Sequence, residues 1–261
     1  MNQTTKTMNY TRYTFDETEG KERQSEAIEL STAPAMIEVK NVSKVFGKKG
    51  EVQTQVLNGA NLQVRKGEFV SLMGASGSGK STLLYLIGGL DREFDGEIDL
   101  CGQSIGKMKE KKLSEVRLSK IGFIFQFYNL VQNLSVEDNI MLPSLVAGRS
   151  RASLKKELDE ILEITGLTAK RKSMPSKLSG GQQQRVAIAR AIIGHPEIIL
   201  ADEATGNLDS KAGDEIMELF RKLNREKGIT ILQVTHSNAC AEYGTRTVVL
   251  KNGKTLEEKN C

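Results

Sequence analysis

The sequence predicts an α/β fold built on a mainly parallel sheet, and two observations lead to it. A glycine-rich loop at residues 74–82 stands between a short apolar run and a segment whose leucines recur at helical spacing, which is the order strand, loop, helix. From residue 179 onward, short apolar runs alternate with longer amphipathic segments. Alternating strands and helices typically form a parallel sheet with helices on both faces.

The composition is that of an ordinary globular protein. The chain has 261 residues, of which 38% are hydrophobic and 27% charged, and its formal net charge is +4. This charge permits contact with an anionic surface without requiring it, and we expect no nucleic-acid partner. The three cysteines are widely spaced and form no C-x-x-C pair, so reduced thiols are expected.

Neither a membrane span nor a secretion signal is apparent. No apolar run approaches the roughly 20 residues that a membrane-spanning helix needs. The first residues lack the apolar core of a signal peptide. We therefore expect a cytoplasmic protein, and if it works at a membrane, another chain supplies the spanning helices.

The chain begins with a predicted flexible polar tail at residues 1–35, which is rich in Thr, Glu, Lys and Gln. The remaining residues, 36–261, contain the periodic patterns of a folded domain. Two alternating segments at 36–46 and 52–64, joined by a turn at 47–50, predict an antiparallel layer that precedes the core.

The middle of the chain predicts further strands and then a helical insertion. After strand 69–73 and the first helix, residues 96–100 and 121–125 are predicted strands. The basic stretch between them, 107–120, is either a docking patch or a solvated helix face, and the second interpretation is favoured. Residues 131–173 contain no convincing strand, and one helical face gathers Leu154, Leu158, Ile161 and Leu162.

The last part of the chain repeats the strand–helix unit. A helix at 182–193 is stopped by Gly194 and Pro196. The predicted elements that follow are strand 198–201, a helix with Ala212, Ile216, Leu219, Phe220 and Leu223 on one face, strand 229–234, strand 247–250 and a turn at Asn252-Gly253 that finishes the chain.

The glycine-rich loop has the G-x-x-x-x-G-K-[ST] spacing of a phosphate-binding loop. Its residues are Gly74, Ala75, Ser76, Gly77, Ser78, Gly79, Lys80, Ser81 and Thr82. Its glycines let successive backbone N–H groups point inward, and the helix N-terminus adds partial positive charge. Lys80 can reach the β- and γ-phosphates, and the Ser81 hydroxyl can ligate Mg²⁺. The alternative is a chance glycine turn, but the strand–loop–helix context predicts a nucleoside triphosphate site.

Polar side chains stand where the predicted parallel strands end, which is where ligands bind in such sheets. Gln126 follows one strand, Asp202 and Glu203 follow the next, and His236 comes shortly after a third. Each alone is ordinarily a turn residue. Together beside a phosphate loop they suggest in-line hydrolysis. Asp202 can hold Mg²⁺, and Glu203 can accept a proton from the attacking water. Gln126 can either ligate Mg²⁺ or orient this water, and His236 can hydrogen-bond both the γ-phosphate and the water.

A second glycine-rich segment, Leu-Ser-Gly-Gly-Gln-Gln-Gln-Arg at 178–185, precedes the predicted helix at 182–193. Its simplest interpretation is a helix start with Ser179 as N-cap. A capped helix N-terminus is also an anion site. Because the chain already has a complete phosphate loop, this second site suggests that the γ-phosphate is held from a neighbouring subunit.

These motifs stand in the order of the ATP-binding-cassette (ABC) ATPases, a family of P-loop NTPases, and the resemblance covers residues 36–259. The segments that carry it are the phosphate loop, Gln126, 178–185, 198–203, Leu208-Asp209 and His236. More narrowly, residues 125–130 and 204–209 resemble the branch of macrolide exporters, lipoprotein-releasing complexes and bacitracin-type resistance transporters. The resemblance implies that residues 36–261 form a nucleotide-binding domain, with a helical subdomain at about 127–178.

The resemblance also implies a head-to-tail dimer with two ATP molecules. Each ATP lies between the phosphate loop of one copy and residues 179–181 of the partner, which are called the signature loop here; the helix that follows is the signature helix. It adds to the nucleotide-contacting residues Phe46, Ser179, Gly180, Gly181, Gln182 and Asp209. Phe46 stands where an adenine-stacking Tyr is usual, although an aromatic residue on a strand is otherwise a core residue.

An ATPase of this family, bound to the cytoplasmic side of a separate permease, is therefore expected, with ATP and Mg²⁺ as cofactors. Residues 127–145 resemble the permease-contacting region, and core packing is the alternative. The cargo remains open, as does the choice between transport and a transmembrane signal. Departures from the family are Ala204 for Pro, Ser237 for Asp, and the extension 1–35.

Two alternatives come from other classes. A soluble cassette ATPase of DNA repair, ribosomes or iron–sulfur assembly shares the motifs. The absence of long coiled coils, zinc cysteines and a second cassette disfavours the first two of these roles. A P-loop kinase or GTPase is disfavoured by the signature helix, by His236 and by the lack of an N-K-x-D motif.

Overall fold

The computed structural model describes residues 32–47 and 52–260, and the side chains of these residues as far as 256. The tail predicted at 1–35 lies outside the described residues except for its last four, and the turn at 47–50 except for Gly47. One compact unit begins at Pro34.

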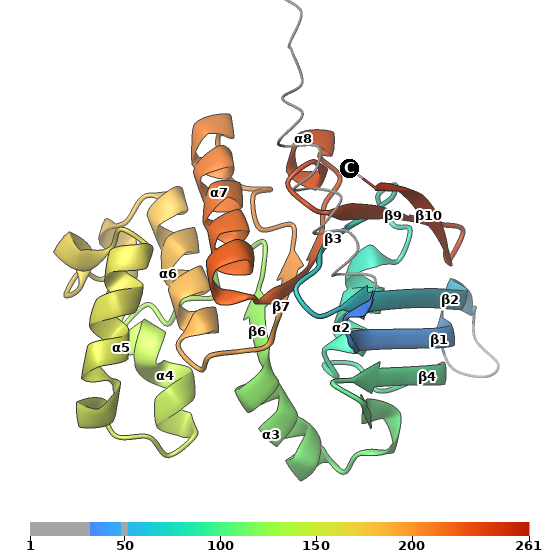
Figure 1. The fold of residues 1–261 in the computed structure, drawn as a ribbon, viewed down its shortest axis with the longest axis horizontal. Helices are drawn as coiled ribbons and strands as arrows, with labels where there is room; N and C mark the ends of the chain where they lie inside the picture. The colour runs from blue at the N-terminus through green and yellow to red at the C-terminus, as the bar shows by residue number, and fades with distance from the viewer. Residues whose placement is uncertain (1–31, 48–51, 261) are drawn as a thin grey trace, which may run out of the picture. The chain divides into compact units, whose positions relative to one another are not determined.

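A six-stranded sheet carries the order β10-β9-β3-β8-β7-β6 (Figure 1). Neighbours from β9 to β6 run parallel, and β10 runs antiparallel to β9, so the predicted mainly parallel sheet is confirmed. The strands are β3 (Phe69–Met73), β6 (Ile121–Ile124), β7 (Ile198–Asp202), β8 (Thr230–Val234), β9 (Arg246–Lys251) and β10 (Lys254–Asn260).

Each face of this sheet is buried against a different layer, because successive side chains of a strand point to opposite sides. In β7, Ile199 and Ala201 join one hydrophobic cluster, whereas Ile198 and Leu200 join another. Leucines and isoleucines of α2 lie in the second cluster, and α6 and α7 contribute to the first. These helices span α2 (Lys80–Ile87), α6 (Gly180–Ile192) and α7 (Ser210–Lys227).

The predicted antiparallel layer is a four-stranded sheet of order β2-β1-β4-β5. Its strands are β1 (Ala35–Phe46), β2 (Thr54–Arg65), β4 (Asp95–Leu100) and β5 (Gln103–Ser104). The sequence predicted β1 and β2 as partners, and this is confirmed. It did not assign strand 96–100 to this layer, yet β4 pairs antiparallel with β1 along residues 95–100.

The predicted helical insertion consists of α4 (Val136–Val146) and α5 (Arg151–Ile164), followed by two 3₁₀ turns at Thr168–Lys170 and Pro175–Lys177. The four apolar residues predicted to share a face of α5 are its buried residues. The basic stretch before β6 contains a 3₁₀ turn at Ile105–Lys107 and α3 (Glu110–Lys120). A short α8 (Asn238–Ala241) follows β8.

The chain does not finish at the Asn252-Gly253 turn, as the sequence had suggested. β10 follows this turn and pairs with β9 along its length. β10 carries several charged residues, which is typical of edge strands and hides the apolar alternation of a core strand.

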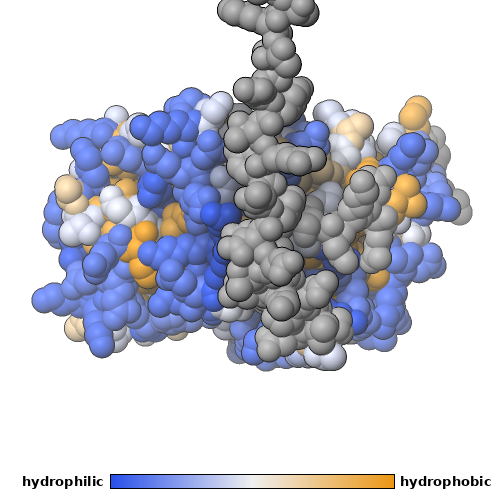
Figure 2. All heavy atoms as spheres, turned by 45° about the horizontal axis from the view of Figure 1, so that its top comes forward, coloured by the Kyte–Doolittle hydropathy of each residue, from blue (hydrophilic) through white to orange (hydrophobic). Residues whose placement is uncertain are grey.

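Hydrophilic residues predominate on the face shown in Figure 2, and hydrophobic residues gather there in smaller patches between them. The helix α7 is amphipathic, since its buried residues recur at helical spacing and its remaining residues are mostly charged. Among the described residues, no helix combines the length and apolarity that crossing a membrane requires.

Candidate nucleotide site

The phosphate loop joins β3 to α2, as predicted, and it depends on glycine at two positions. Gly74 and Gly79 have φ values of 153° and 99°, which disfavour other residues. A Cβ on Gly74 would overlap the carbonyl oxygen of Leu250, and one on Gly79 would lie 2.8 Å from Cγ1 of Val56. The backbone is therefore shaped by its neighbours, and the residues at the loop's apex, Ala75, Ser76 and Gly77, are exposed.

Lys80 is the first residue of α2 and lies back across the loop. Its Nζ donates to the carbonyl oxygens of Gly74 at 2.9 Å and Ala75 at 3.0 Å. The side chain is 6% exposed, so the ammonium is held within the loop rather than in solvent. A positive charge in this place can compensate anionic oxygens bound by the loop.

The next residue, Ser81, meets the end of β7. Its hydroxyl donates to Oδ1 of Asp202 at 2.8 Å, although the residues are 121 apart in sequence. Tyr85, one helical turn after Ser81, donates to the other carboxylate oxygen at 2.7 Å. Burial of the phenol, together with this hydrogen bond, raises the pKa of Tyr85 to about 12. Two hydroxyls of α2 thus fix the orientation of the Asp202 carboxylate.

Sequence reasoning missed Tyr85. The spacing from Ser81 to Tyr85 is one helical turn, so both side chains lie on one face of α2. That spacing was a usable signal, because the face that carries Ser81 toward Asp202 also carries Tyr85.

Glu203 directly follows β7 and has a φ of 45°, which is rare for a residue with a side chain. Its N–H donates to the carbonyl of Val234 at 3.0 Å, and its own carbonyl accepts from Gly206 at 2.9 Å. These bonds hold a conformation that costs on the order of 1–3 kcal/mol, a feature that clusters at active sites.

The Glu203 carboxylate and the imidazole of His236 are brought together by β7 and β8. Nδ1 of His236 lies 3.3 Å from Oε1 of Glu203. The Glu203 side chain is 24% exposed and that of His236 is 65% exposed, so both are open to a bound substrate. The predicted meeting of these two residues at neighbouring strand ends is therefore present in the fold.

Gln126 lies two residues beyond β6, next to the loop that follows Glu203. Its carbonyl accepts from Asn207 Nδ2 at 3.0 Å, and a Cβ on Gly206 would lie 3.0 Å from Gln126 Nε2. The amide thus lies beside this loop, and no hydrogen bond joins it to Asp202 in the described part of the chain. Gln126 follows β6, Asp202 ends the adjacent strand β7, and Glu203 directly follows β7, so all three lie at the carboxyl ends of neighbouring strands.

The second glycine-rich segment is a capped helix start, as the sequence predicted. Ser179 is the N-cap of α6, its hydroxyl accepts from Gln182 N, and the Gln182 side chain accepts from Ser179 N. A Cβ on Gly180 would lie 2.8 Å from the Tyr128 hydroxyl, and one on Gly181 would lie 3.3 Å from Ala212 Cβ. Within the described residues, no hydrogen bond or ion pair links Ser179 or Gln182 to the phosphate loop.

The far half of α6 is attached to the segment that follows Gln126. The guanidinium of Arg190 donates to the carbonyls of Asn129 at 2.6 Å and Tyr128 at 3.0 Å. Burial lowers the pKa of Arg190 below its usual value. Sequence reasoning did not single out this arginine, because its partners are 61 and 62 residues away.

Phe46 and Asp209 are the other two residues that the family resemblance added to the predicted site. Phe46 ends β1 and is 45% exposed, so it is not a core residue. The Asp209 carboxylate accepts from Ala212 N at 2.9 Å and caps α7. Asp209 therefore has a structural partner within its own chain.

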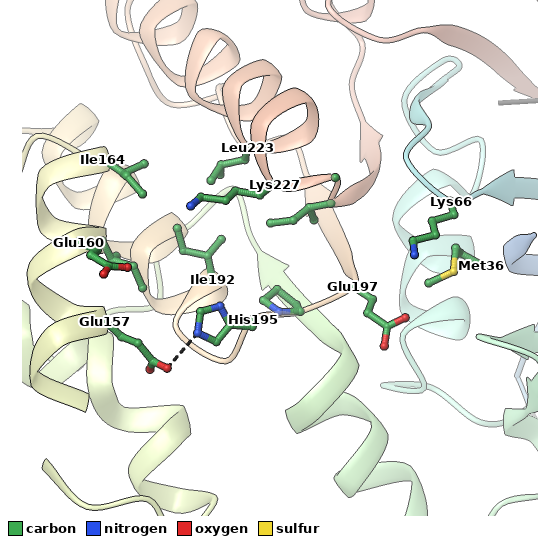
Figure 3. A pocket seen from close by; sticks show the side chains of 14 residues that line it. Met36, Lys66, Glu157, Glu160, Ile164, Ile192, His195, Glu197, Leu223 and Lys227 are labelled. Carbon is green, nitrogen blue, oxygen red and sulfur yellow. Dashed lines mark hydrogen bonds and ion pairs between the residues drawn. The ribbon is translucent and has the colours of Figure 1, made fainter. Parts of the chain in front are cut away.

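A cavity of about 350 Å³ lies elsewhere, between α5, the end of α6 and the end of α7 (Figure 3). Glu197 and Ile229 line it, and they directly precede β7 and β8. The cavity is therefore at the amino ends of these strands, opposite the edge that carries Asp202. The dashed line in Figure 3 joins two residues of its lining, with His195 Nε2 lying 2.9 Å from Glu157 Oε1. It contains none of the predicted site residues.

Comparisons with known proteins agree with this arrangement. The ABC transporter family matches residues 57–206. The lipoprotein-releasing system ATP-binding protein LolD 1 of Rhodopseudomonas palustris is 42% identical, over 84% of this chain and 97% of its own. The macrolide export ATP-binding/permease protein MacB of Mannheimia succiniciproducens is 43% identical, over 85% of this chain and 34% of that longer protein.

Solved structures give the same answer. The ATP-binding cassette MJ0796 of Methanocaldococcus jannaschii, as a dimer bound to ADP and Pi in a post-hydrolysis state, superposes with a TM-score of 0.79. It is 42% identical and covers 86% of this chain and 98% of its own. With a phosphate loop, an acidic strand end and a capped signature helix on this fold, the chain belongs to the ABC transporter family as an ATP-binding, ATP-hydrolysing cassette.

Proposed function

We propose that this chain is the ATPase subunit of a membrane transporter and that the residues at the carboxyl edge of its sheet carry out the hydrolysis. The observation that carries the proposal is the contact between Ser81 Oγ and Asp202 Oδ1 at 2.8 Å. It joins the phosphate loop to the strand end that bears Glu203, so substrate binding and proton transfer share one site.

Residues 74–82 bind the triphosphate. Backbone N–H groups of the loop and the N-terminus of α2 face the anionic oxygens. When ATP enters, Lys80 exchanges its two carbonyl partners for the β- and γ-phosphates. This exchange is favourable because bonds between two charged groups are stronger than bonds to a neutral carbonyl.

The oxygen donors Ser81 and Asp202 suit Mg²⁺, which takes few protein ligands alongside substrate phosphates. Their separation of 2.8 Å supports a shared role, and Gln126 is a further candidate ligand. No group of three or more His, Cys, Asp or Glu side chains forms a self-sufficient metal cage among the described residues. Bound Mg²⁺ would neutralise charge on the phosphates.

Glu203 accepts the proton of the water that attacks the γ-phosphorus, and the leaving ADP oxygen departs in line. His236, 3.3 Å from the Glu203 carboxylate, binds the γ-phosphate and orients the same water. Gln126, whose side-chain amide lies beside the loop after Glu203, is a further candidate to orient the attacking water. The chain thus supplies position and charge rather than a covalent intermediate.

The signature loop acts on the ATP of a second copy. Ser179, Gly180 and Gly181 form a helix N-terminus with its own capping box, and among the described residues no hydrogen bond joins them to the phosphate loop of the same chain. The cassette MJ0796 is dimeric, and a head-to-tail dimer of this chain would bring this anion site onto the partner's γ-phosphate. Asp209 caps α7 and supports the same surface.

A separate permease is the second partner. Phe127, the first residue of the predicted permease-contacting region 127–145, is 70% exposed, and Val146, directly after that region, is 73% exposed. Exposed apolar side chains near a functional site commonly mark a protein interface. The names LolD and MacB support lipoprotein release or export as the transporter type, with this chain attached peripherally to the cytoplasmic side of the membrane.

The ATPase part is tested by Lys80→Ala, with Lys111→Ala on the exposed face of α3 as matched control. Loss of the only lysine in the loop should weaken ATP binding and abolish turnover, since the phosphate charge is left uncompensated. Hydrolysis by Lys80→Ala near the parent rate would contradict the assigned site.

The permease part is tested by purifying the tagged chain from membranes and identifying what accompanies it. Phe127→Asp should release the membrane protein while leaving ATP binding intact. Leu256→Asp, at an exposed leucine of β10, should not. A stoichiometric complex with a ribosome or a DNA-repair assembly instead of a permease would overturn the transporter proposal.

A further inference from the structure

The strand that ends at Phe46 carries a buried charge two residues earlier. Lys44 is 3% exposed, and its Nζ lies 2.9 Å from Oδ1 and 2.8 Å from Oδ2 of Asp91. The carboxylate of Glu93 is farther away, at 3.9 Å, and is itself almost fully solvated. A buried ion pair is weak evidence for stability, because both charges lose their hydration. Its position in the fold points to a different role.

The carboxylate end of this pair is fixed to the helix that begins at the phosphate loop. Asp91 follows α2, and the N–H groups of Leu90 and Asp91 both donate to the carbonyl of Tyr85 on that helix. The Asp91 carboxylate also accepts from Glu93 N at 3.0 Å. Burial opposes ionisation of Asp91, but its bonds to Lys44 and to this N–H outweigh burial and hold its pKa below the usual range.

The ammonium end is fixed to the aromatic ring. Nζ of Lys44 lies 4.8 Å from the centroid of Phe46, within the range of a cation–π contact. The ring is otherwise 45% exposed. The neighbouring strand completes the connection, since Phe46 pairs with Thr54 and Lys44 with Leu57. Val56, between those partners, lies beside Gly79 of the phosphate loop, where an added Cβ would be 2.8 Å from Val56 Cγ1.

We infer that Lys44 is a positioning residue for the nucleotide base. By pairing with Asp91, it ties the antiparallel sheet to the end of α2 and holds the Phe46 ring at a set distance from the phosphate loop. The ammonium covers one part of the ring, and the exposed part receives the base. The inference rests on the base-stacking role that the family resemblance implies for Phe46. It adds that the contribution of the base to ATP affinity depends on the Lys44–Asp91 ion pair.

The test compares ATP with inorganic tripolyphosphate, which occupies the phosphate loop without a base. Dissociation constants of both are measured by calorimetry for the parent, Phe46→Ala, Lys44→Met, Asp91→Asn and the double variant Phe46→Ala/Lys44→Met. Asp91→Asn guards against misfolding, because it keeps the shape of the side chain and an acceptor for Glu93 N while it removes the charge that pairs with Lys44. Lys40→Met is the matched control, since Lys40 on the same strand pairs with Glu38 at 2.9 Å but is 54% exposed.

Lys44→Met and Asp91→Asn should raise the dissociation constant of ATP about three- to tenfold, the usual worth of an aromatic stack. Tripolyphosphate affinity should change less than about twofold, and the Michaelis constant of the ATPase should rise while its maximal rate stays. The double variant should be no worse than Phe46→Ala, because both changes remove the same contact.

Other outcomes distinguish the stacking role of Phe46 from the positioning role of Lys44. If Phe46→Ala weakens ATP binding and Lys44→Met does not, the positioning role is wrong and the base site stands. If Lys44→Met weakens tripolyphosphate as much as ATP, the pair shapes the phosphate loop and the inference is overturned. If Phe46→Ala leaves ATP affinity unchanged, the stacking role fails and the inference fails with it. None of these outcomes would contradict the proposed role of Glu203 as general base.

Discussion

Replacing Glu203 by Gln isolates the proton-transfer step from substrate binding. The two side chains have nearly the same shape, so the bonds that hold this residue at a φ of 45° through its backbone should persist. Only the proton acceptor 3.3 Å from His236 is lost. Ser81, Asp202 and Lys80 are unaltered, so ATP should bind within about twofold of the parent affinity.

Hydrolysis should fall by about 10²–10⁴, the usual worth of a positioned general base. This corresponds to about 2.7–5.5 kcal/mol of activation free energy. Because unhydrolysed ATP then remains at the shared site, Glu203→Gln should form a dimer in Mg-ATP that Mg-ADP does not support. Single-turnover hydrolysis and gel filtration at saturating nucleotide measure the two effects.

A second change identifies the surface that holds the dimer together. Ser179→Arg in the Glu203→Gln background places bulk and charge on the signature loop and should abolish the ATP-dependent dimer without affecting ATP affinity. Hydrolysis by Glu203→Gln within threefold of the parent would refute its role as base. Full ATP occupancy in a variant that stays monomeric would refute the shared site in the isolated chain.

Three further predictions concern the signature loop, a buried carboxylate and the metal. Gly180→Ala should impair ATP-dependent dimerisation at least about tenfold but not ATP affinity, since its methyl would lie 2.8 Å from the Tyr128 hydroxyl. Gly194→Ala is the comparison for expression, because a Cβ there would lie 3.5 Å from its nearest neighbour, the Leu118 carbonyl oxygen. Burial raises the pKa of Glu137, but Lys172 and Arg171 outweigh it and lower the pKa overall. Its stabilisation is therefore complete above the unfolded pKa of about 4.3 and is lost as pH falls through the lower folded value. Urea unfolding should show Glu137→Gln less stable by about 1–3 kcal/mol at pH 7, with the difference shrinking below pH 4; an undiminished difference there would contradict the ionic origin. Chelation by EDTA should stop hydrolysis and excess Mg²⁺ should restore it; turnover that continues in EDTA would contradict a metal-dependent site.

The parallel core could be predicted because each strand and the loop after it are encoded in a short stretch of sequence. The apolar runs of β3, β7 and β8 and the loops that follow them lie within short windows, and the rule that ligands bind at carboxyl ends then brings Gln126, Glu203 and His236 together. The structure adds the distances and shows that Asp202 is the last residue of its strand rather than the first beyond it.

The features that the sequence did not predict depend on partners far along the chain. The pairing of β4 with β1 crosses more than 50 residues, and the alternation of a strand does not say which neighbour it takes. The Lys44–Asp91 pair spans 47 residues and the Tyr85–Asp202 bond 117. The Lys44–Asp91 pair has no spacing signal, since a buried charge looks like a surface charge until its partner is known. The Tyr85–Asp202 bond had only the indirect signal of the one-turn spacing between Ser81 and Tyr85.

Helix α6 has a mechanical consequence for the signature loop. Its 13 residues form a stiff rod of about 20 Å. Ser179 caps one end, and Arg190, two residues before the other end, holds two carbonyls of the segment after Gln126. A push on that segment must either break both Arg190 bonds or swing the rod. If the signature loop acts on the partner's ATP as proposed, a force applied at exposed Phe127 would therefore move Ser179 at the far end of α6 relative to the γ-phosphate bound by the partner copy.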